Sequence, residues 1–137
     1  MEKSSIKQFI PQREPFIMVS ELCSASEKVA HTKLVCSDEN IFCTNGFFQE
    51  PGIIENIAQT AAILTGYNAI KNKTKVKRGF IGSITNLNIY QLAKCNSEIE
   101  TLVTVEGQVM NVTLINGVVK QNQELIAECE MKIFLEE

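Results

Sequence analysis

Histidine is nearly absent from this sequence, and no apolar run is long enough to cross a bilayer. His31 is the single histidine among 137 residues, which argues against an imidazole-rich metal centre. The longest helix-compatible apolar run carries Glu55 and Gln59, and such polar groups are costly inside a membrane. The 13 basic and 16 acidic residues leave a net charge of −3, so the overall charge gives no reason to expect nucleic-acid binding.

The cysteines lack the spacing of a metal or redox motif. Their number is odd, no pair is separated as C-x-x-C, and the first residues lead into no secretory apolar segment. We therefore expect reduced thiols, mostly small core residues, in a cytoplasmic protein. With one histidine and no cysteine cluster, we expect no metal site. The five cysteines are Cys23, Cys36, Cys43, Cys95 and Cys129.

One long apolar segment organises the chain. Pro51 suits the first turn of a helix, and the residues up to 70 are apolar almost all round, which predicts a helix of roughly 30 Å that is buried on most sides. Glu55 and Gln59 share one face of it, at a spacing of four. Glu55 is either a charge favoured at the helix start that reaches water or a catalytic carboxylate that faces a pocket.

The rest of the chain reads as strands, which predicts an α+β protein with one domain over residues 1–137. A sheet of about six antiparallel strands would curl around the helix, because no other element can cover its apolar face. The predicted segments are a short amphipathic stretch at 1–9 and strands at 16–22, 28–36, 79–92, 98–109, 110–120 and 123–135.

Smaller features complete this pattern. Asn45-Gly46 predicts a tight turn in the connection into the helix, and Asn116-Gly117 is interpreted as a bulge. His31 lies on a strand face, and that pattern gives little reason for a functional role. The basic residues 71–78 are either a solvated loop or a docking patch for an acidic partner.

Three stretches resemble the 3-hydroxyacyl-acyl-carrier-protein dehydratases of the hot-dog fold. Residues 10–19, IPQREPFIMV, resemble that family's L-P-H-R-x-P-F-L-x-V-D motif, and residues 51–59, PGIIENIAQ, resemble its P-G-V-L-x-x-E-A-x-A-Q helix start, one residue shorter before the glutamate. Residues 80–84, FIGSI, resemble its A-G-I strand. The helix is also similar to dehydratase-like proteins of aryl-polyene and polyketide-type pathways.

The sequence departs from the family in the loop before the helix. The family has G-H-F-P-G there, and its histidine shares the proton work with the glutamate; here residues 43–50 read CTNGFFQE, and Asn45 stands about where the histidine would be. The resemblance implies Glu55 as the catalytic acid or base, oxyanion-binding N–H groups near the loop and helix start, and no cofactor. The expected substrate-binding residues are Asn45, Gly46, Phe47, Gly52 and Gln59.

Three functions remain open. The first is a dehydratase for acyl-carrier-protein or coenzyme A thioesters, or a subunit of one that a related hot-dog chain completes with a histidine. The second is a thioesterase that uses Glu55, and the third is a non-catalytic acyl-binding protein. The resemblance also implies a homodimer or heterodimer with one continuous sheet. We expect a tunnel at Glu55, with basic side chains near its mouth.

Overall fold

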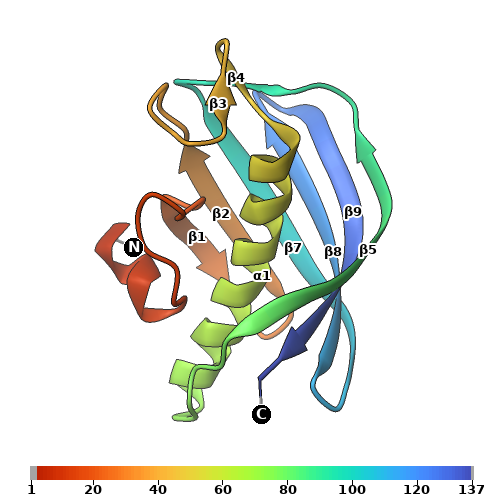
Figure 1. Ribbon diagram of the computed structural model, residues 1–137. Helices are drawn as coiled ribbons and strands as arrows, with labels where there is room; N and C mark the ends of the chain where they lie inside the picture. Colours follow the sequence, from red (N-terminus) through yellow and green to blue (C-terminus); the bar gives the residue numbers. More distant parts are fainter. Residues whose placement is uncertain (1–2, 137) are drawn as a thin grey trace.

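The computed structural model describes residues 3–136 and contains one long helix, α1 (Glu50–Lys71), wrapped by a curled antiparallel sheet (Figure 1). This confirms the predicted arrangement of about six strands around a single helix. The sheet has the strand order β1-β2-β7-β8-β9-β5. Its strands are β1 (Glu21–Ala25), β2 (Val29–Val35), β5 (Gly79–Ile89), β7 (Glu98–Val109), β8 (Val112–Gln121) and β9 (Glu124–Leu135).

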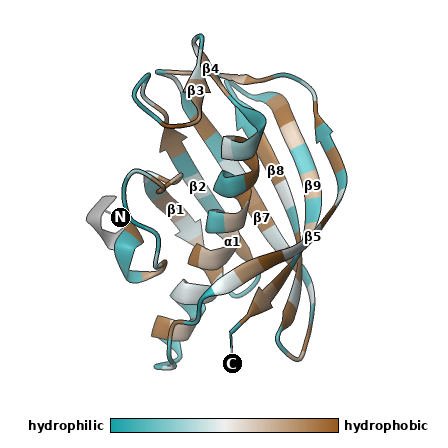
Figure 2. Ribbon diagram, in the orientation of Figure 1, coloured by the Kyte–Doolittle hydropathy of each residue, from teal (hydrophilic) through white to brown (hydrophobic). Residues whose placement is uncertain are grey.

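Helix α1 is buried on most of its circumference, as its apolar sequence predicts. Its buried residues include Ile53, Ile57, Ile63 and Leu64. Strand β9 alternates between buried apolar residues and more exposed polar ones, and Figure 2 shows how hydropathy changes along the strands of the sheet. Within the described residues, no helix is long and apolar enough to span a membrane.

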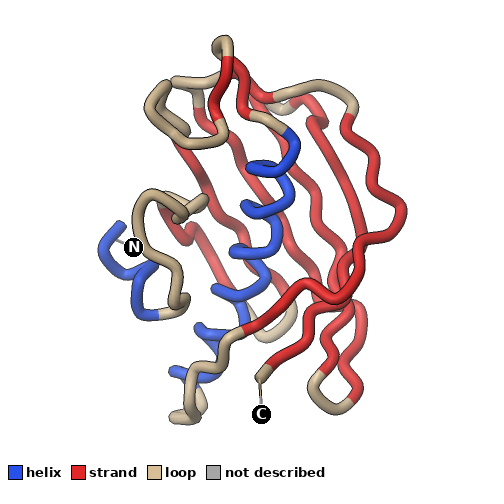
Figure 3. Tube along the Cα trace, viewed as in Figure 1, coloured by secondary structure: helices blue, strands red, loops and turns tan. Residues whose placement is uncertain are grey.

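A second, small sheet lies beside the N-terminal end of the helix and was not predicted (Figure 3). It consists of β3 (Cys43–Thr44), β4 (Phe47–Phe48) and β6 (Ala93–Lys94). The first two form a hairpin whose central residues, Asn45 and Gly46, both have positive φ, at 54° and 83°. The predicted tight turn at this dipeptide is therefore confirmed, since positive φ favours asparagine and glycine.

The N-terminal segment packs along the helix. A short 3-10 helix, η1 (Lys3–Gln8), is followed by an irregular stretch, and Ile6 and Phe9 are buried. Residues 1 and 2 of the predicted amphipathic stretch lie outside the described part. The strand predicted at residues 16–22 is wrong in its start, because β1 begins only at Glu21. Gln59 accepts a hydrogen bond from the backbone N–H of Met18, and Asn56 donates one to its carbonyl oxygen. These two groups are therefore not available for pairing with a neighbouring strand.

The predicted bulge at Asn116-Gly117 is also wrong. Strand β8 keeps an unbroken register there with both neighbours, and the irregularity on β7 lies between Val105 and Gly107. Gly117 faces the helix, where a Cβ atom would overlap the side chain of Ile57. The glycine is needed for the close approach of helix and strand, which a pattern within one strand does not reveal.

The cysteines depart from the expectation of reduced thiols. Cys43 on β3 and Cys95 after β6 form a disulfide, with Cα atoms 6.4 Å apart, whereas Cys23, Cys36 and Cys129 are free. The small sheet brings the two bonded residues together across 52 positions of sequence. Because the small sheet was not predicted, neither was this pairing.

Candidate functional site

Glu55 lies in the second turn of α1 and is partly exposed. Its Oε2 atom accepts a hydrogen bond of 2.7 Å from Nε2 of Gln59, one helical turn later. Residues four apart on a helix are neighbours, so the pairing follows directly from the spacing. Within residues 3–136, no hydrogen bond reaches Oε1 and no basic side chain forms an ion pair with this carboxylate. One carboxylate oxygen is thus oriented while the other remains available.

Gln59 is buried and connects the carboxylate to the N-terminal segment. Its Nε2 also donates to the carbonyl oxygen of Phe16 at 2.7 Å, and its Oε1 accepts from the backbone N–H of Met18 at 2.7 Å. Both amide hydrogens and the oxygen therefore have partners within the chain. In this structure Gln59 positions Glu55 and the segment beside it.

Asn56 is a second buried amide, and the sequence analysis did not single it out. Its Nδ2 donates to the carbonyl oxygen of Met18 at 2.8 Å, and the hydroxyl of Thr101 donates to its Oδ1. Thr60 on the next turn shares a 2.8 Å hydrogen bond with Thr32 of β2. The signal in the sequence was a set of polar side chains inside an otherwise apolar helix, since buried polar groups need partners.

The single histidine lies on the other side of the sheet. Thr32 is buried and bonded to the helix, and adjacent strand residues point to opposite faces, so His31 faces away from α1. Its Nε2 lies 3.6 Å from Oε2 of Glu100 on β7. His31 therefore does not meet Glu55 within this chain.

The other predicted site residues form a separate group at the hairpin. Asn45, Gly46 and Phe47 are exposed, and the carbonyl oxygen of Gly46 accepts from the N–H of Cys95 at 2.9 Å. Gly52 is buried, and a Cβ atom there would overlap Phe48. The N–H of Gly52 donates to the carbonyl oxygen of Gln49 at 3.0 Å, within the first turn of the helix.

A groove of about 870 Å³ lies near the opposite, C-terminal end of α1. Lys71, Lys75 and Lys77 line it together with Leu64 and Val105, and Glu55 is not among its lining residues. The basic loop is exposed, as predicted, and its lysines border this groove. The expected tunnel at Glu55 stays a prediction, and the lysines expected near its mouth border this groove at the other end of the helix.

The arrangement around Glu55 is suited to proton transfer. A carboxylate with one oxygen oriented by an amide and the other available can accept or donate a proton at a substrate.

The structure also brings Cys36, Cys43 and Cys95 together. The argument that the chain has no cysteine cluster is therefore wrong, because these residues are distant in sequence but adjacent in space.

Comparison with known proteins identifies the family. The family model described as "ApeP-like: ApeP dehydratase" matches residues 4–137. A 3-hydroxyacyl-[acyl-carrier-protein] dehydratase FabZ of Bacillus velezensis is 29% identical over 145 residues, which cover 100% of this chain and 99% of the relative. The alignment with this relative covers the whole described structure, including the N-terminal segment and helix α1.

Solved structures with low sequence identity share the fold. The dehydratase heterocomplex ApeI:P from Xenorhabdus doucetiae aligns with a TM-score of 0.83 at 12% identity, and the alignment covers 96% of this chain and 91% of that one. A hypothetical thioesterase protein with coenzyme A from Streptococcus pneumoniae aligns at 0.69 with 7% identity, covering 85% and 84%. These likenesses confirm the hot-dog fold.

Proposed function

The chain belongs to the ApeP-like dehydratase family, and on this premise we propose that it is the carboxylate-bearing subunit of a 3-hydroxyacyl-thioester dehydratase. A related hot-dog subunit supplies the imidazole, because His31 of this chain faces away from α1. The substrate is a 3-hydroxyacyl chain on an acyl carrier protein, as the names of the curated relatives suggest. The observation that carries the proposal is Glu55, held by Gln59 with Oε1 available.

Dehydration needs two proton-transfer groups. One removes the C2 proton, and the other protonates the C3 hydroxyl so that it leaves as water. Negative charge develops meanwhile on the thioester oxygen, which backbone N–H groups can stabilise. Glu55 supplies one of the two groups, and an imidazole is suited to the other because it titrates near neutral pH.

A second copy of this chain is a poor source of that imidazole. His31 is the single histidine, and it lies on the sheet face that points away from α1, with its Nε2 3.6 Å from a carboxylate oxygen of Glu100. Asn45 at the hairpin tip can form hydrogen bonds but cannot transfer a proton at neutral pH. The fold shared with a dehydratase described as a heterocomplex supports a related but different partner.

The basic loop and the groove beside it support a carrier-protein substrate. Lys71, Lys75 and Lys77 lie at the end of α1 away from the hairpin, and none of them forms an ion pair within the described residues. Unpaired cations on an exposed rim speed association with an acidic partner at low salt. An acidic carrier protein would therefore approach from this end.

The test is reconstitution. The purified chain is assayed alone and with a related hot-dog subunit that has a histidine in its loop, and water loss from 3-hydroxyacyl carrier protein is followed by mass spectrometry. We expect turnover only in the mixture, and a loss of about 10²- to 10⁴-fold in the mixture with Glu55→Gln.

Glu50→Gln is the matched control, because Glu50 is an exposed acid in the first turn of the same helix. It should leave turnover unchanged. Full activity of the mixture with Glu55→Gln would contradict the proposal, and so would full activity of the chain alone.

Thioester hydrolysis is the second candidate, favoured by one observation: the chain carries a positioned carboxylate without a neighbouring imidazole. A carboxylate can act on thioesters without histidine, either as nucleophile or as base for water. Release of free acid from an acyl thioester by the chain alone, lost in Glu55→Gln, would establish this function instead. Acyl binding without turnover in any mixture would leave an acyl-binding role.

A further inference from the structure

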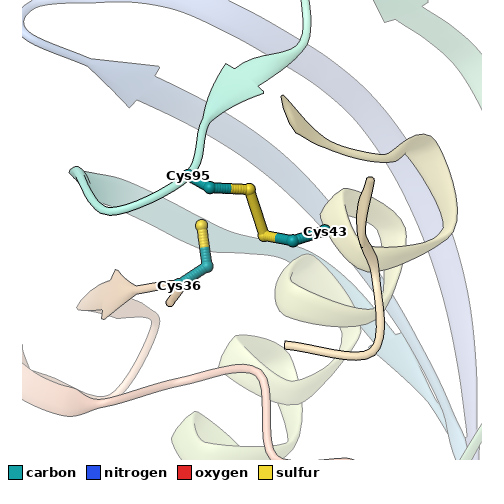
Figure 4. A group of neighbouring side chains, drawn as sticks. All are labelled: Cys36, Cys43 and Cys95. Atoms are coloured by element: carbon teal, nitrogen blue, oxygen red, sulfur yellow. A yellow bond between two sulfur atoms is a disulfide. The ribbon is translucent and has the colours of Figure 1, made fainter. Parts of the chain in front are cut away.

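Three cysteine sulfurs meet at the end of the molecule that carries the hairpin. Cys36 follows β2, Cys43 lies in β3 and Cys95 follows β6, and their Sγ atoms all lie within 4.8 Å of one another (Figure 4). We propose that these three residues, once the disulfide between Cys43 and Cys95 is reduced, bind one Zn²⁺ ion as thiolates. The inference is independent of the proposed dehydration.

Backbone hydrogen bonds hold the three residues together without help from the disulfide. The N–H of Asn96 donates to the carbonyl oxygen of Cys36 at 2.7 Å, and the N–H of Cys95 donates to that of Gly46 at 2.9 Å. Nδ2 of Asn96 also donates to Oδ2 of Asp38 at 2.7 Å. The segments that carry the cysteines are therefore fixed to one another by contacts that survive reduction, and the sulfurs remain close.

Pairing within the small sheet fixes the third segment. Cys43 pairs with Phe48 in the hairpin, and β4 in turn pairs with β6, directly before Cys95. The three segments thus form one hydrogen-bonded unit. Few side-chain movements are needed to turn the cluster into a ligand set.

The distances suit a thiolate-bound ion. Zinc binds thiolate sulfur at about 2.3 Å, so ligand sulfurs in a tetrahedral site lie about 3.8 Å apart. The Cα atoms of Cys43 and Cys95 lie 6.4 Å apart, and all three sulfurs already lie within 4.8 Å of one another. After reduction, modest rotations of Cys43 and Cys95 therefore bring the sulfurs to that spacing. Three protein ligands leave the fourth position to water.

Burial is graded in a way that suits an ion entering from solvent. Cys36 is fully buried, whereas Cys43 and Cys95 are partly exposed. The two outer sulfurs give access, and the inner one is shielded from water. The remaining cysteines are elsewhere: Cys23 lies on β1 and Cys129 on β9.

Reduction and binding balance as two separate steps. A dithiol reductant gives up two electrons and two protons and becomes its own disulfide, while Cys43 and Cys95 become thiols. Zinc then displaces the thiol protons of the three cysteines. A disulfide oxidant takes two electrons from the thiolates of Cys43 and Cys95, takes up two protons and becomes a dithiol, while the Cys43–Cys95 bond forms again. The ion is then released and Cys36 takes up a proton, so the disulfide and the zinc complex exclude each other.

The experiment measures zinc binding rather than activity. The chain is reduced with a dithiol, freed of it without oxygen, and titrated with Zn²⁺ against a chromophoric chelator; Cd²⁺ is used in parallel for its thiolate absorption band. We expect one ion per reduced chain and none in the oxidised chain. Cys36→Ser should weaken binding at least tenfold.

Cys23→Ser is the matched control, because this thiol is partly exposed and lies outside the cluster. It should bind zinc as the unchanged protein does. Circular dichroism checks that each variant folds, and Cys95→Ser answers the same question if Cys36→Ser does not. The proposal is wrong if the reduced chain binds zinc no more tightly than the cluster variants, or if Cys23→Ser loses binding equally.

Discussion

Gln59 illustrates how one side chain can serve both the fold and the site. Its amide makes three hydrogen bonds: to Glu55, to the carbonyl oxygen of Phe16 and to the N–H of Met18. The first orients a carboxylate, and the other two hold the N-terminal segment on the helix. Because Gln59 is only 1% exposed and Met18 is fully buried, water cannot replace the bond to Met18 if the amide is removed.

Replacing Gln59 with leucine should therefore destabilise the protein markedly. Leucine fits the volume but leaves the N–H of Met18 and the carbonyl oxygen of Phe16 without their partner. The N–H of Met18 is the fully buried one of the two, and a buried polar group left unpaired costs about 1–3 kcal/mol, so we expect the free energy of unfolding to fall by about 1–3 kcal/mol. Urea denaturation followed by circular dichroism measures this change.

Gln91→Leu provides the comparison, since Gln91 is an exposed amide that also bonds to a carboxylate, that of Glu124. Water can satisfy the groups that this change leaves free, and the free energy of unfolding should change by less than about 0.5 kcal/mol. Similar losses in the two variants would contradict the role given to Gln59.

At the scale of elements, the contact between α1 and β8 depends on Gly117. The side chain of Ile57 fills the space where a Cβ atom of residue 117 would lie. Gly117→Ala should push the helix away from the sheet or force Ile57 out of its rotamer, and overpacking of this kind costs about 1–3 kcal/mol. Thermal unfolding measures the loss, and Ile57→Ala should cost less stability in the Gly117→Ala variant than in the unchanged protein, because the two residues are in direct contact.

Gly107→Ala is the matched change on the neighbouring strand. A Cβ atom at residue 107 meets nothing within 4 Å, so this variant should be as stable as the unchanged protein or slightly more so. An equal loss of stability in both variants would mean that alanine itself, and not the overlap with Ile57, causes the effect.

Periodic elements could be predicted from the sequence because their pattern is local. The expected helix ended at residue 70 and the observed one ends at Lys71, and the strand expected at residues 98–109 matches β7 in both bounds. The start of β1 was wrong because Gln59 and Asn56, far away in sequence, bind the backbone around Met18. The strands of the small sheet have two residues each, too few for a period to show.

In the candidate site, too, local features could be predicted from the sequence and contacts between distant segments could not. The sequence predicted that Glu55 and Gln59 share one face of the helix, because they are four residues apart, and the structure adds the hydrogen bond between them. The cysteine cluster depends on three segments that meet only in the folded chain, and Cys36 and Cys95 are 59 positions apart in sequence. Contacts of this kind carry no local signal.

At the scale of the whole molecule, the two edges of the main sheet differ. Segment η1 packs against the edge strand β1, whereas β5 ends the sheet on the other side. Strand β5 and the residue after it expose large apolar side chains: Phe80, Ile81, Leu87 and Tyr90. An uncovered edge with exposed apolar residues is a site for pairing with another strand, and natural proteins otherwise protect such edges.

We expect β5 to pair with the matching strand of a second hot-dog chain, either a copy or the related subunit. Light scattering on the chain alone and on the mixture should give the mass of two chains in at least one of them. Ile81→Lys combined with Leu87→Lys should give single-chain masses in both, because lysine on an edge opposes strand pairing.

The location of the interface is tested by a matched change inside the sheet. Leu102 on β7 is 44% exposed and has the same side chain as Leu87, but β7 is paired on both sides, with β2 and with β8. Leu102→Lys should therefore leave the two-chain mass intact, since no open edge is altered. A loss of assembly with this variant, or single-chain masses for the unchanged protein both alone and mixed, would contradict pairing through β5. If the assembly does form through β5, its second chain can bring an imidazole toward Glu55, which His31 on the outer face of this chain does not do.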